Sequence, residues 1–240
     1  SVFYDLKDPN SFLNDVNFLL KNDGIFLLEF ADLLSIIKYK LFDTICHEHL
    51  EYYSAKVIIK MLEKNNLKLI NIKKNNINGG SVRFYISSKN SKYKVNYRNI
   101  KNYLSEENKF MIDKKKVFTN LFRNISKLKI NLNKKLIKLK KNGKKIHGYG
   151  ASTKGNVLLQ YFKIDNKILQ CIADRNPEKN GLYTPGTKIK IVSEEMSRKL
   201  KPDYYLVLPW HFKKEILVRE KVIRNKGVKF IFPLPNFKIF

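Results

Sequence analysis

The sequence is poor in the residues that mark several common classes of protein. Only two of its 240 residues are cysteines, Cys46 and Cys171, which excludes a disulfide framework and a four-cysteine metal site. We therefore expect a reducing, cytoplasmic location. No apolar run is long enough to cross a bilayer, so we expect no membrane partner. The start has no secretory signal and opens on Ser1, and we expect the chain to be a segment of a longer protein.

Arginine is also scarce, although the chain is strongly basic. Only seven of the 48 basic residues are arginine, and the formal net charge is +27. Nucleic-acid readers favour arginine for bidentate contacts to phosphate and guanine, whereas the lysines here are scattered over most of the chain. We expect no nucleic-acid partner, and a basic nucleic-acid-binding protein stays open as an alternative. The excess charge favours any anionic substrate.

Helix and strand patterns alternate over residues 1–90. Capping residues and apolar periodicity predict a helix that begins at Asp8, a buried strand Ile25–Phe30, a helix capped by Ser54, and strands Leu67–Ile72 and Ser81–Ser87. The segment between the last two strands is short and contains the turn Asn78–Gly80, so it leaves no room for a helix. We expect these two strands to be antiparallel neighbours.

Glycine and proline are absent from residues 96–142, where apolar residues recur at helical spacing. This pattern predicts a helical connector. After Gly143 the pattern becomes β-α-β, with strands predicted at Lys145–His147, Ile168–Ala173, Ile189–Val192, Tyr204–Leu208 and Val228–Phe232, and helices at Lys154–Phe162, from Ser193 and from about Phe212. Such alternation is typical of an α/β fold with an open parallel sheet covered by helices.

The segment Cys46-His47-Glu48-His49 is the densest cluster of reactive side chains, and it has three interpretations. A His-x-His pair in an extended chain points both rings to one side, so it can bind a metal if Cys46 or Asp43 supplies a third ligand. A histidine oriented by a carboxylate can instead act as a general acid or base. The third interpretation is a structural histidine with no catalytic role.

The segment Gly148–Gly155 lies between a predicted strand and a predicted helix. Glycines at such a turn let the backbone approach a phosphate, and the helix start offers N–H groups. Asp174 ends the next strand, where a ribose-binding acid is expected. A tight turn without a ligand is the alternative. Arg83 lies on a predicted strand and is either an anion contact or an exposed side chain without a ligand. The pair Trp210-His211 follows a predicted strand and is either a ligand contact or a Trp packed in the domain core.

Together these motifs resemble the sugar C-methyltransferases of deoxysugar biosynthesis. The resemblance covers nearly the whole chain and is weak only in the helical connector. It is carried by six segments, which are Phe42–Ser54, Gly79–Arg83, Gly148–Asn156, Asp174–Lys179, Tyr183–Thr187 and Pro202–His211.

The resemblance implies a fold and a domain order. Residues 1–90 would be the C-terminal part of a Rossmann-like methyltransferase domain, residues 91–142 a helical connector, and residues 143–240 a Rossmann-like C-terminal domain with a parallel sheet. S-adenosylmethionine is the implied cofactor, but the glycine-rich loop that would hold it is missing from this chain. An upstream half of the same enzyme is then the expected partner. The family's zinc module is missing too, so we expect no metal.

The resemblance also implies a reaction and its residues. The substrate would be a nucleotide-linked keto-deoxysugar, and His49 would remove a proton to form an enolate that is then methylated. Glu48 would orient a histidine, and His47 or Tyr52 would donate to the enolate oxygen. Cys46 stands where the family has a tyrosine. The expected substrate-binding residues are Cys46, Tyr52, Arg83, Gly148, Tyr149, Gly150, Ser152, Lys154, Asp174, Trp210 and His211.

The sequence also leaves a second function open. The chain can be a binding module that holds a nucleotide sugar and performs no methylation by itself.

Overall fold

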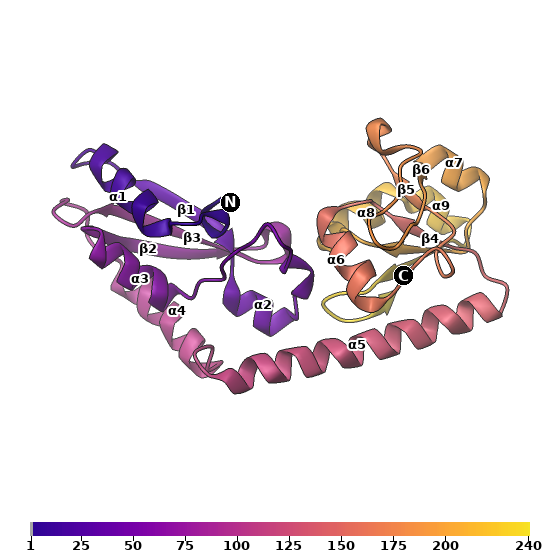
Figure 1. The fold of residues 1–240 in the computed structure, drawn as a ribbon, viewed down its shortest axis with the longest axis horizontal. Coiled ribbons are helices and arrows are strands. Elements are labelled where there is room, and N and C mark those ends of the chain that lie inside the picture. Colours follow the sequence, from indigo (N-terminus) through magenta and orange to yellow (C-terminus); the bar gives the residue numbers. More distant parts are fainter. Residues whose placement is uncertain (1) are drawn as a thin grey trace. The chain divides into compact units, whose positions relative to one another are not determined.

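The computed structural model describes residues 2–240, which divide into two compact units (Figure 1). Unit 1 comprises the chain up to Tyr39 together with His47–Leu121. Unit 2 comprises Lys40–Cys46 together with Phe122–Phe240. The short segment Lys40–Cys46 therefore packs with residues that follow it by more than seventy positions in the sequence. The division into residues 1–90, 91–142 and 143–240 stays a prediction.

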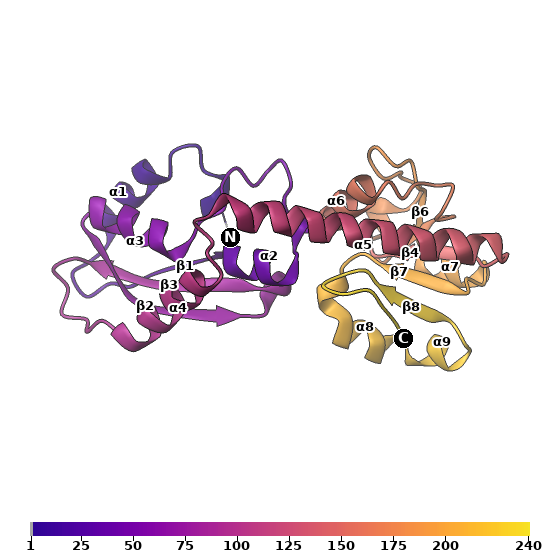
Figure 2. The same cartoon turned by 90° about the horizontal axis from the view of Figure 1, so that it is seen from below.

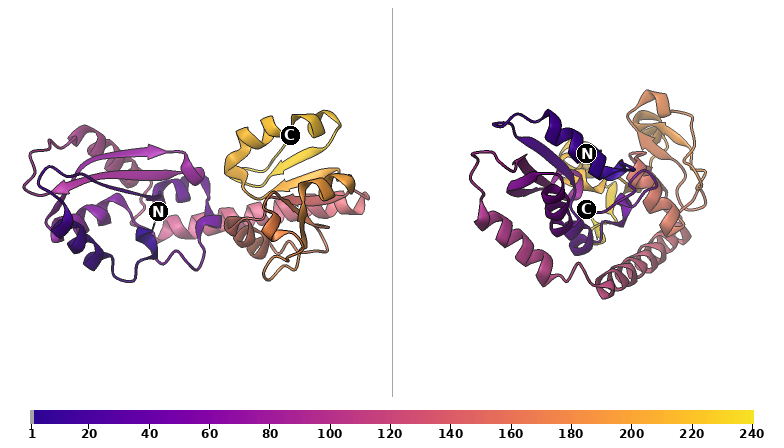
Figure 3. Two further views of the ribbon diagram at one scale, coloured as in Figure 1. Left: turned by 90° about the horizontal axis from the view of Figure 1, so that it is seen from above. Right: turned by 60° about the vertical axis from the view of Figure 1, so that its left-hand side comes forward.

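Unit 1 is built on a three-stranded sheet with the order β1-β3-β2, seen in the left panel of Figure 3. Strand β3 is antiparallel to both of its neighbours, which confirms the pairing predicted for the last two strands. The elements are η1 (Phe3–Asp5), α1 (Pro9–Leu19), β1 (Phe26–Ala31), α2 (Leu33–Tyr39), α3 (Ala55–Lys64), β2 (Leu67–Asn75), η3 (Ile77–Gly79), β3 (Ser81–Ser88) and α4 (Tyr97–Lys109).

Capping and amphipathic faces position the helices of unit 1 as the sequence predicts. The Asp8 carboxylate accepts from two backbone N–H groups of α1, and the Ser54 hydroxyl accepts from one of α3. Helices α1 and α3 lie on one side of the sheet (Figure 2) and bury Leu13, Ile58 and Leu62 in a core shared with the strands. Burial of each such side chain contributes about 1.5–3 kcal/mol.

Three features of unit 1 differ from the sequence-based prediction. Strand β1 is an edge strand with alternating burial, and Leu27 is 52% exposed, because helices cover only one face here. Helix α2 was not predicted. The helical stretch is not continuous, because Met111 has a φ of +50° in a turn between α4 and α5 (Lys115–Lys141).

Unit 2 contains a six-stranded sheet with the order β6-β5-β4-β7-β8-β9. The first five strands are parallel and β9 is antiparallel. The elements are η2 (Phe42–Thr44), the main part of α5, β4 (Ile146–Tyr149), α6 (Thr153–Phe162), β5 (Ile172–Asp174), η4 (Pro177–Lys179), β6 (Ile191–Ser193), α7 (Glu194–Lys199), β7 (Tyr204–Val207), η5 (Trp210–Phe212), α8 (Lys213–Arg219), α9 (Lys221–Asn225), β8 (Lys229–Phe232) and β9 (Lys238–Ile239). The predicted α/β fold with a parallel sheet is confirmed, and its strand order is Rossmann-like.

Two details of this sheet were not predicted. Strand β5 is shorter than expected, because Ile168 and Leu169 form turn hydrogen bonds back to the Asp165 carbonyl. Strand β9 adds an antiparallel edge that the sequence pattern did not reveal. Among residues 2–240 we find no helix with the length and apolar character needed to cross a membrane.

The strand order creates a topological switch point between β4 and β7. These two strands are parallel neighbours, but helix α6, which follows β4, lies on one side of the sheet and helix α8, which follows β7, lies on the other (Figure 2). The helices that follow the two strands therefore run to opposite sides of the sheet, and a crevice forms beside the carboxyl ends of the strands. Ligands of open α/β sheets bind in such crevices.

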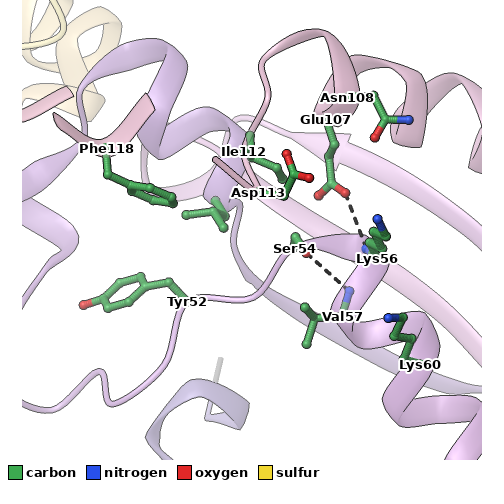
Figure 4. Close-up of a pocket in the computed structure, with 11 residues that line it drawn as sticks. Tyr52, Ser54, Lys56, Val57, Lys60, Glu107, Asn108, Ile112, Asp113 and Phe118 are labelled. Atoms are coloured by element: carbon green, nitrogen blue, oxygen red, sulfur yellow. Dashed lines mark hydrogen bonds between the residues drawn. The ribbon is translucent and has the colours of Figure 1, made fainter. Parts of the chain in front are cut away.

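A buried carboxylate of α4 caps the start of α3, and it provides a test of the unit 1 packing. Glu107 is only 3% exposed, and its carboxylate accepts from the Ala55 N–H at 2.7 Å and the Lys56 N–H at 3.4 Å (Figure 4). Burial raises the pKa of Glu107. Its neighbour Glu106 lies nearer the surface, where it forms ion pairs with Lys38 and Lys74.

We expect Glu107→Ala to lower the free energy of unfolding by about 1–3 kcal/mol, because it leaves buried N–H groups without an acceptor. The matched control Glu106→Ala loses only surface ion pairs and should cost at most about 1 kcal/mol. Urea unfolding of the two variants measures both values. Equal losses would contradict the capping role of Glu107.

Candidate functional site

Three glycines of the segment Gly148–Gly155 are required by close packing, and two of them, Gly150 and Gly155, lie at the switch point. A Cβ at Gly150 would lie 2.7 Å from the Pro209 ring, and this residue has a φ of +80°. A Cβ at Gly148 would lie 2.6 Å from Ile172, and one at Gly155 would lie 2.8 Å from Leu208. The loops after β4 and β7 therefore touch, and only glycine lets them approach so closely.

Most backbone N–H groups of this segment already have acceptors within the chain. The Ala151 N–H donates to Asp174 Oδ2 at 2.6 Å, and the Gly155 N–H donates to the Ser152 hydroxyl at 3.0 Å. Lys179 Nζ donates to the Ala151 carbonyl at 2.7 Å. Ser152 is thus the cap of α6. Binding of a phosphate here would depend on cationic side chains more than on the backbone.

A cavity of about 800 Å³ opens beside these loops, wholly within unit 2. It lies at the carboxyl ends of β4, β5 and β7, as expected for the switch point. Its lining residues are Tyr149, Gly150, Ala151, Ser152, Ala173, Asp174, Arg175, Asn176, Lys179, Glu194, Pro209, Phe212, Glu215, Ile216 and Arg219. The Asp174 carboxylate accepts from two backbone N–H groups, and a carboxylate has lone pairs for further donors.

One wall of this cavity is held by a charge network that sequence reasoning missed. The Glu220 carboxylate is only 2% exposed, and it accepts from the Tyr149 hydroxyl at 2.6 Å and from the guanidinium groups of Arg198 and Arg219. Arg219 also donates to Glu194 and lies over the Tyr149 ring. The network fixes the orientation of Arg219. No local pattern marks Glu220, because its partners come from three other elements.

A second group of side chains, most of them predicted to bind substrate, meets at the Pro209–Phe212 turn. Trp210 Nε1 donates to Asp43 Oδ2 at 2.7 Å. Asp43 is fully buried, which raises its pKa, while the nearby Lys154 ammonium and the indole N–H oppose that shift. Burial lowers the pKa of Lys154, and attraction to Asp43 and Cys46 raises it.

His211 completes this second group. Burial and repulsion from Lys154 lower its pKa to about 4, so the imidazole is neutral at neutral pH. We call Asp43, Cys46, Lys154, Trp210 and His211 the Asp43 cluster. Four of these residues were predicted to bind substrate, and the structure brings them together. Asp43 was considered only as a metal ligand, although its place in the Phe42–Ser54 motif signalled a function.

The predicted catalytic segment lies in unit 1, except for Cys46. The centroid of the His49 ring lies 4.2 Å from that of the Tyr4 ring and 6.4 Å from that of the Tyr52 ring. His49 Nδ1 is buried and has no hydrogen-bond partner. His47 is 95% exposed, and its Nδ1 lies 3.9 Å from a Glu48 carboxylate oxygen.

The other two residues predicted for unit 1 have different surroundings. Tyr52 lines a cavity of about 380 Å³ with Ser54, Glu107 and Phe118 (Figure 4). Arg83 pairs with Glu29 across strands β1 and β3, an ion pair that explains this guanidinium without a ligand. In residues 2–240 no three His, Cys, Asp or Glu side chains are placed to hold a metal ion.

Comparison with known proteins gives two concordant matches. Over 237 residues the chain is 29% identical to the C-methyltransferase NovU of Streptomyces niveus. This alignment covers 99% of the chain but only 56% of the relative. The family described as the C-methyltransferase C-terminal domain matches residues 76–235, which include the Gly148–Gly155 loop, the cavity and most of the Asp43 cluster. The chain belongs to the C-methyltransferase C-terminal domain family.

Proposed function

We propose that this chain is part of an S-adenosylmethionine-dependent enzyme that methylates a carbon atom of a nucleotide-linked keto-deoxysugar. The family and the name of the relative support methyl transfer to carbon. The sugar substrate comes from the sequence resemblance. A sugar carbon becomes nucleophilic only after it loses a proton, so the enzyme needs a base beside a keto group.

The observation that carries this proposal is the environment of His49. Its Nδ1 is buried without a hydrogen-bond partner, and its ring lies near the rings of Tyr4 and Tyr52. A buried imidazole nitrogen without a partner is costly for stability and is typical of a functional site. We assign to His49 the removal of the proton. The electron pair of the broken C–H bond moves toward the keto oxygen and forms the enolate.

The neighbouring residues take supporting roles in this proposal. Glu48 orients an imidazole, and its carboxylate already lies 3.9 Å from His47 Nδ1. His47 is exposed and Tyr52 lines a cavity, so each can donate to the enolate oxygen. Cys46, which stands where the family has a tyrosine, is a weaker donor than a phenol.

The described residues do not fit S-adenosylmethionine at the strand-to-helix turn of unit 1. The residue at that turn is Asp32, which is 1% exposed. Its carboxylate caps α2 by accepting from the backbone N–H groups of Leu34 and Ser35, and it also accepts from the Tyr103 hydroxyl. The Asp32 carboxylate is thus occupied within the chain. We therefore assign the holding of the methyl donor to another part of the enzyme, the upstream half that the resemblance implies.

We assign the nucleoside diphosphate to the 800 Å³ cavity of unit 2. Asp174 is placed at the end of β5 to accept from ribose hydroxyls. The guanidinium of Arg175 is exposed at the cavity, whereas that of Arg219 is paired with Glu194 and Glu220. Because this cavity lies in one unit, a module that only holds the nucleotide sugar is the second candidate function.

The role of His49 can be tested separately from methyl transfer. With the keto-sugar in deuterated water and no methyl donor, the complete enzyme should exchange the proton on the carbon to be methylated. His49→Gln cannot accept that proton at neutral pH, and we expect exchange and methylation to slow by about a hundredfold or more.

His47→Gln is the matched control and should cost much less, because His47 only assists. Normal exchange by His49→Gln together with slow exchange by His47→Gln would reverse the two roles. Normal exchange by both variants would leave the histidines structural and contradict the proposed base.

The nucleotide cavity can be tested by calorimetric titration of this chain with nucleoside diphosphates. Arg175→Met removes an exposed charge at the cavity, and we expect the Kd to rise about tenfold through loss of a charge-assisted phosphate contact. Arg123→Met removes an exposed charge from α5 as the control and should leave the Kd unchanged. Absence of diphosphate binding by the unaltered chain would refute the assignment.

A further inference from the structure

The 3-10 helix η1 holds the segment that follows His49 through backbone hydrogen bonds. The Tyr4 carbonyl accepts from the Leu50 N–H at 2.9 Å and from the Glu51 N–H at 3.1 Å. A backbone carbonyl has two lone pairs, so a single residue of η1 can bind both N–H groups. The backbone on the carboxyl side of His49 is therefore fixed to the backbone of Tyr4.

A buried aromatic group fixes η1 itself to the core of unit 1. Phe3 is only 2% exposed, and its ring centroid lies 5.3 Å from that of Tyr53 and 6.1 Å from that of Phe30. The Tyr4 ring is edge-on to Phe30, with centroids 6.3 Å apart. Aromatic side chains in such contacts bury a large apolar area and have few rotatable bonds. Tyr4 therefore has a defined place in unit 1, and its ring offers a rigid surface to its neighbours.

The imidazole of His49 packs on that surface and has no hydrogen bond at Nδ1. Its ring centroid lies 4.2 Å from that of Tyr4, at an interplanar angle of 51°. Rotation of a histidine ring about its last side-chain bond has broad minima, so a further contact must fix the ring. In many sites that contact is a hydrogen bond at one ring nitrogen. His49 Nδ1 is buried without a partner in the described part of the chain, so packing against Tyr4 takes over this task.

We propose that Tyr4 is a positioning residue of the reaction, whose ring sets the orientation of the His49 imidazole and whose carbonyl fixes the backbone beside it. This inference rests on the proposed function, because it takes His49 as the base. Tyr4 acts through the imidazole and not on the sugar. A base must lie within hydrogen-bond reach of the proton that it removes, and a misplacement of about 1 Å can slow a reaction about a hundredfold.

The packing can be measured by NMR on this chain alone. We expect nuclear Overhauser contacts between the ring protons of Tyr4 and His49. Tyr4→Leu removes the aromatic ring, so the ring-proton signals of His49 should shift, whereas Tyr4→Phe keeps the ring and should leave them near their original positions. Both variants keep the backbone carbonyl, so slow exchange of the Leu50 and Glu51 N–H groups with deuterated water checks that unit 1 is folded.

The effect on the reaction can be measured in the complete enzyme, with the keto-sugar in deuterated water and no methyl donor. We expect Tyr4→Leu to lower the exchange rate at saturating keto-sugar by about tenfold to a hundredfold, because the imidazole is misplaced. The KM for the keto-sugar should stay unchanged, because Tyr4 does not bind the sugar. Tyr4→Phe should keep most of the rate.

Two further variants show whether Tyr4 acts through His49. In the His49→Gln background, Tyr4→Leu should cause no further loss, because the group that it positions is already gone. Phe12→Leu is the matched control, since Phe12 contacts Phe3 and Phe26 in the core of unit 1. It removes an aromatic ring from the same core and should keep the exchange rate.

The outcomes separate this inference from the proposed function. Normal exchange by Tyr4→Leu together with slow exchange by His49→Gln would overturn the positioning role and leave His49 as the base. Normal exchange by His49→Gln would overturn the proposed base and the positioning role with it. A loss in Tyr4→Leu that is absent from Tyr4→Phe and from Phe12→Leu supports the inference.

The remaining outcomes show an effect other than positioning, and each would overturn the inference. An equal loss in Phe12→Leu, or an added loss in the His49→Gln background, would show a general effect on folding. A loss in Tyr4→Phe as large as that in Tyr4→Leu would assign the effect to the hydroxyl. Absence of Overhauser contacts between the two rings in the unaltered chain would overturn the inference even if a variant failed to fold.

Discussion

The hydrogen bond from the Trp210 indole to Asp43 joins segments that lie 167 residues apart in the sequence. It joins the short segment Lys40–Cys46 to η5 of unit 2, and Phe42 of the same segment packs against Tyr161 and Phe162 of α6. Asp43 is fully buried, and a lone carboxylate in such a place would cost several kcal/mol. The indole N–H and the charge of Lys154 offset that cost. The interaction therefore makes the segment that ends in Cys46 a part of unit 2.

The rest of the site depends on how closely the loops after β4 and β7 approach. Glycine at positions 150 and 155 removes the side chains that would clash with Pro209 and Leu208, which follow β7. Pro209 and Phe212 of the turn after β7 line the cavity, and Trp210 and His211 between them belong to the Asp43 cluster. The network around Glu220 then fixes the far wall. Backbone packing thus positions the polar groups of the site.

Local patterns predicted most of the fold, and they predicted less of the site. Helix caps such as Asp8 and Ser54 and the alternation after Gly143 depend on neighbouring residues, so they are visible in the sequence. The exposed face of β1 and the added strand β9 depend on which elements cover or extend a sheet, which no local pattern encodes. The motif residues that meet at the switch point were identified, but their partners Asp43 and Glu220 were missed, since a buried ion pair is set by distant contacts.

The most direct test of this account uses the single tryptophan of the chain. Its indole N–H gives one resolved proton signal, and its exchange with deuterated water can be followed by NMR. The account predicts slow exchange in the unaltered chain, because this N–H is buried and bonded to Asp43, and faster exchange in Asp43→Ala. Exchange at the rate of a solvent-exposed indole in the unaltered chain would contradict the docking of Asp43 on unit 2 and the site built around it.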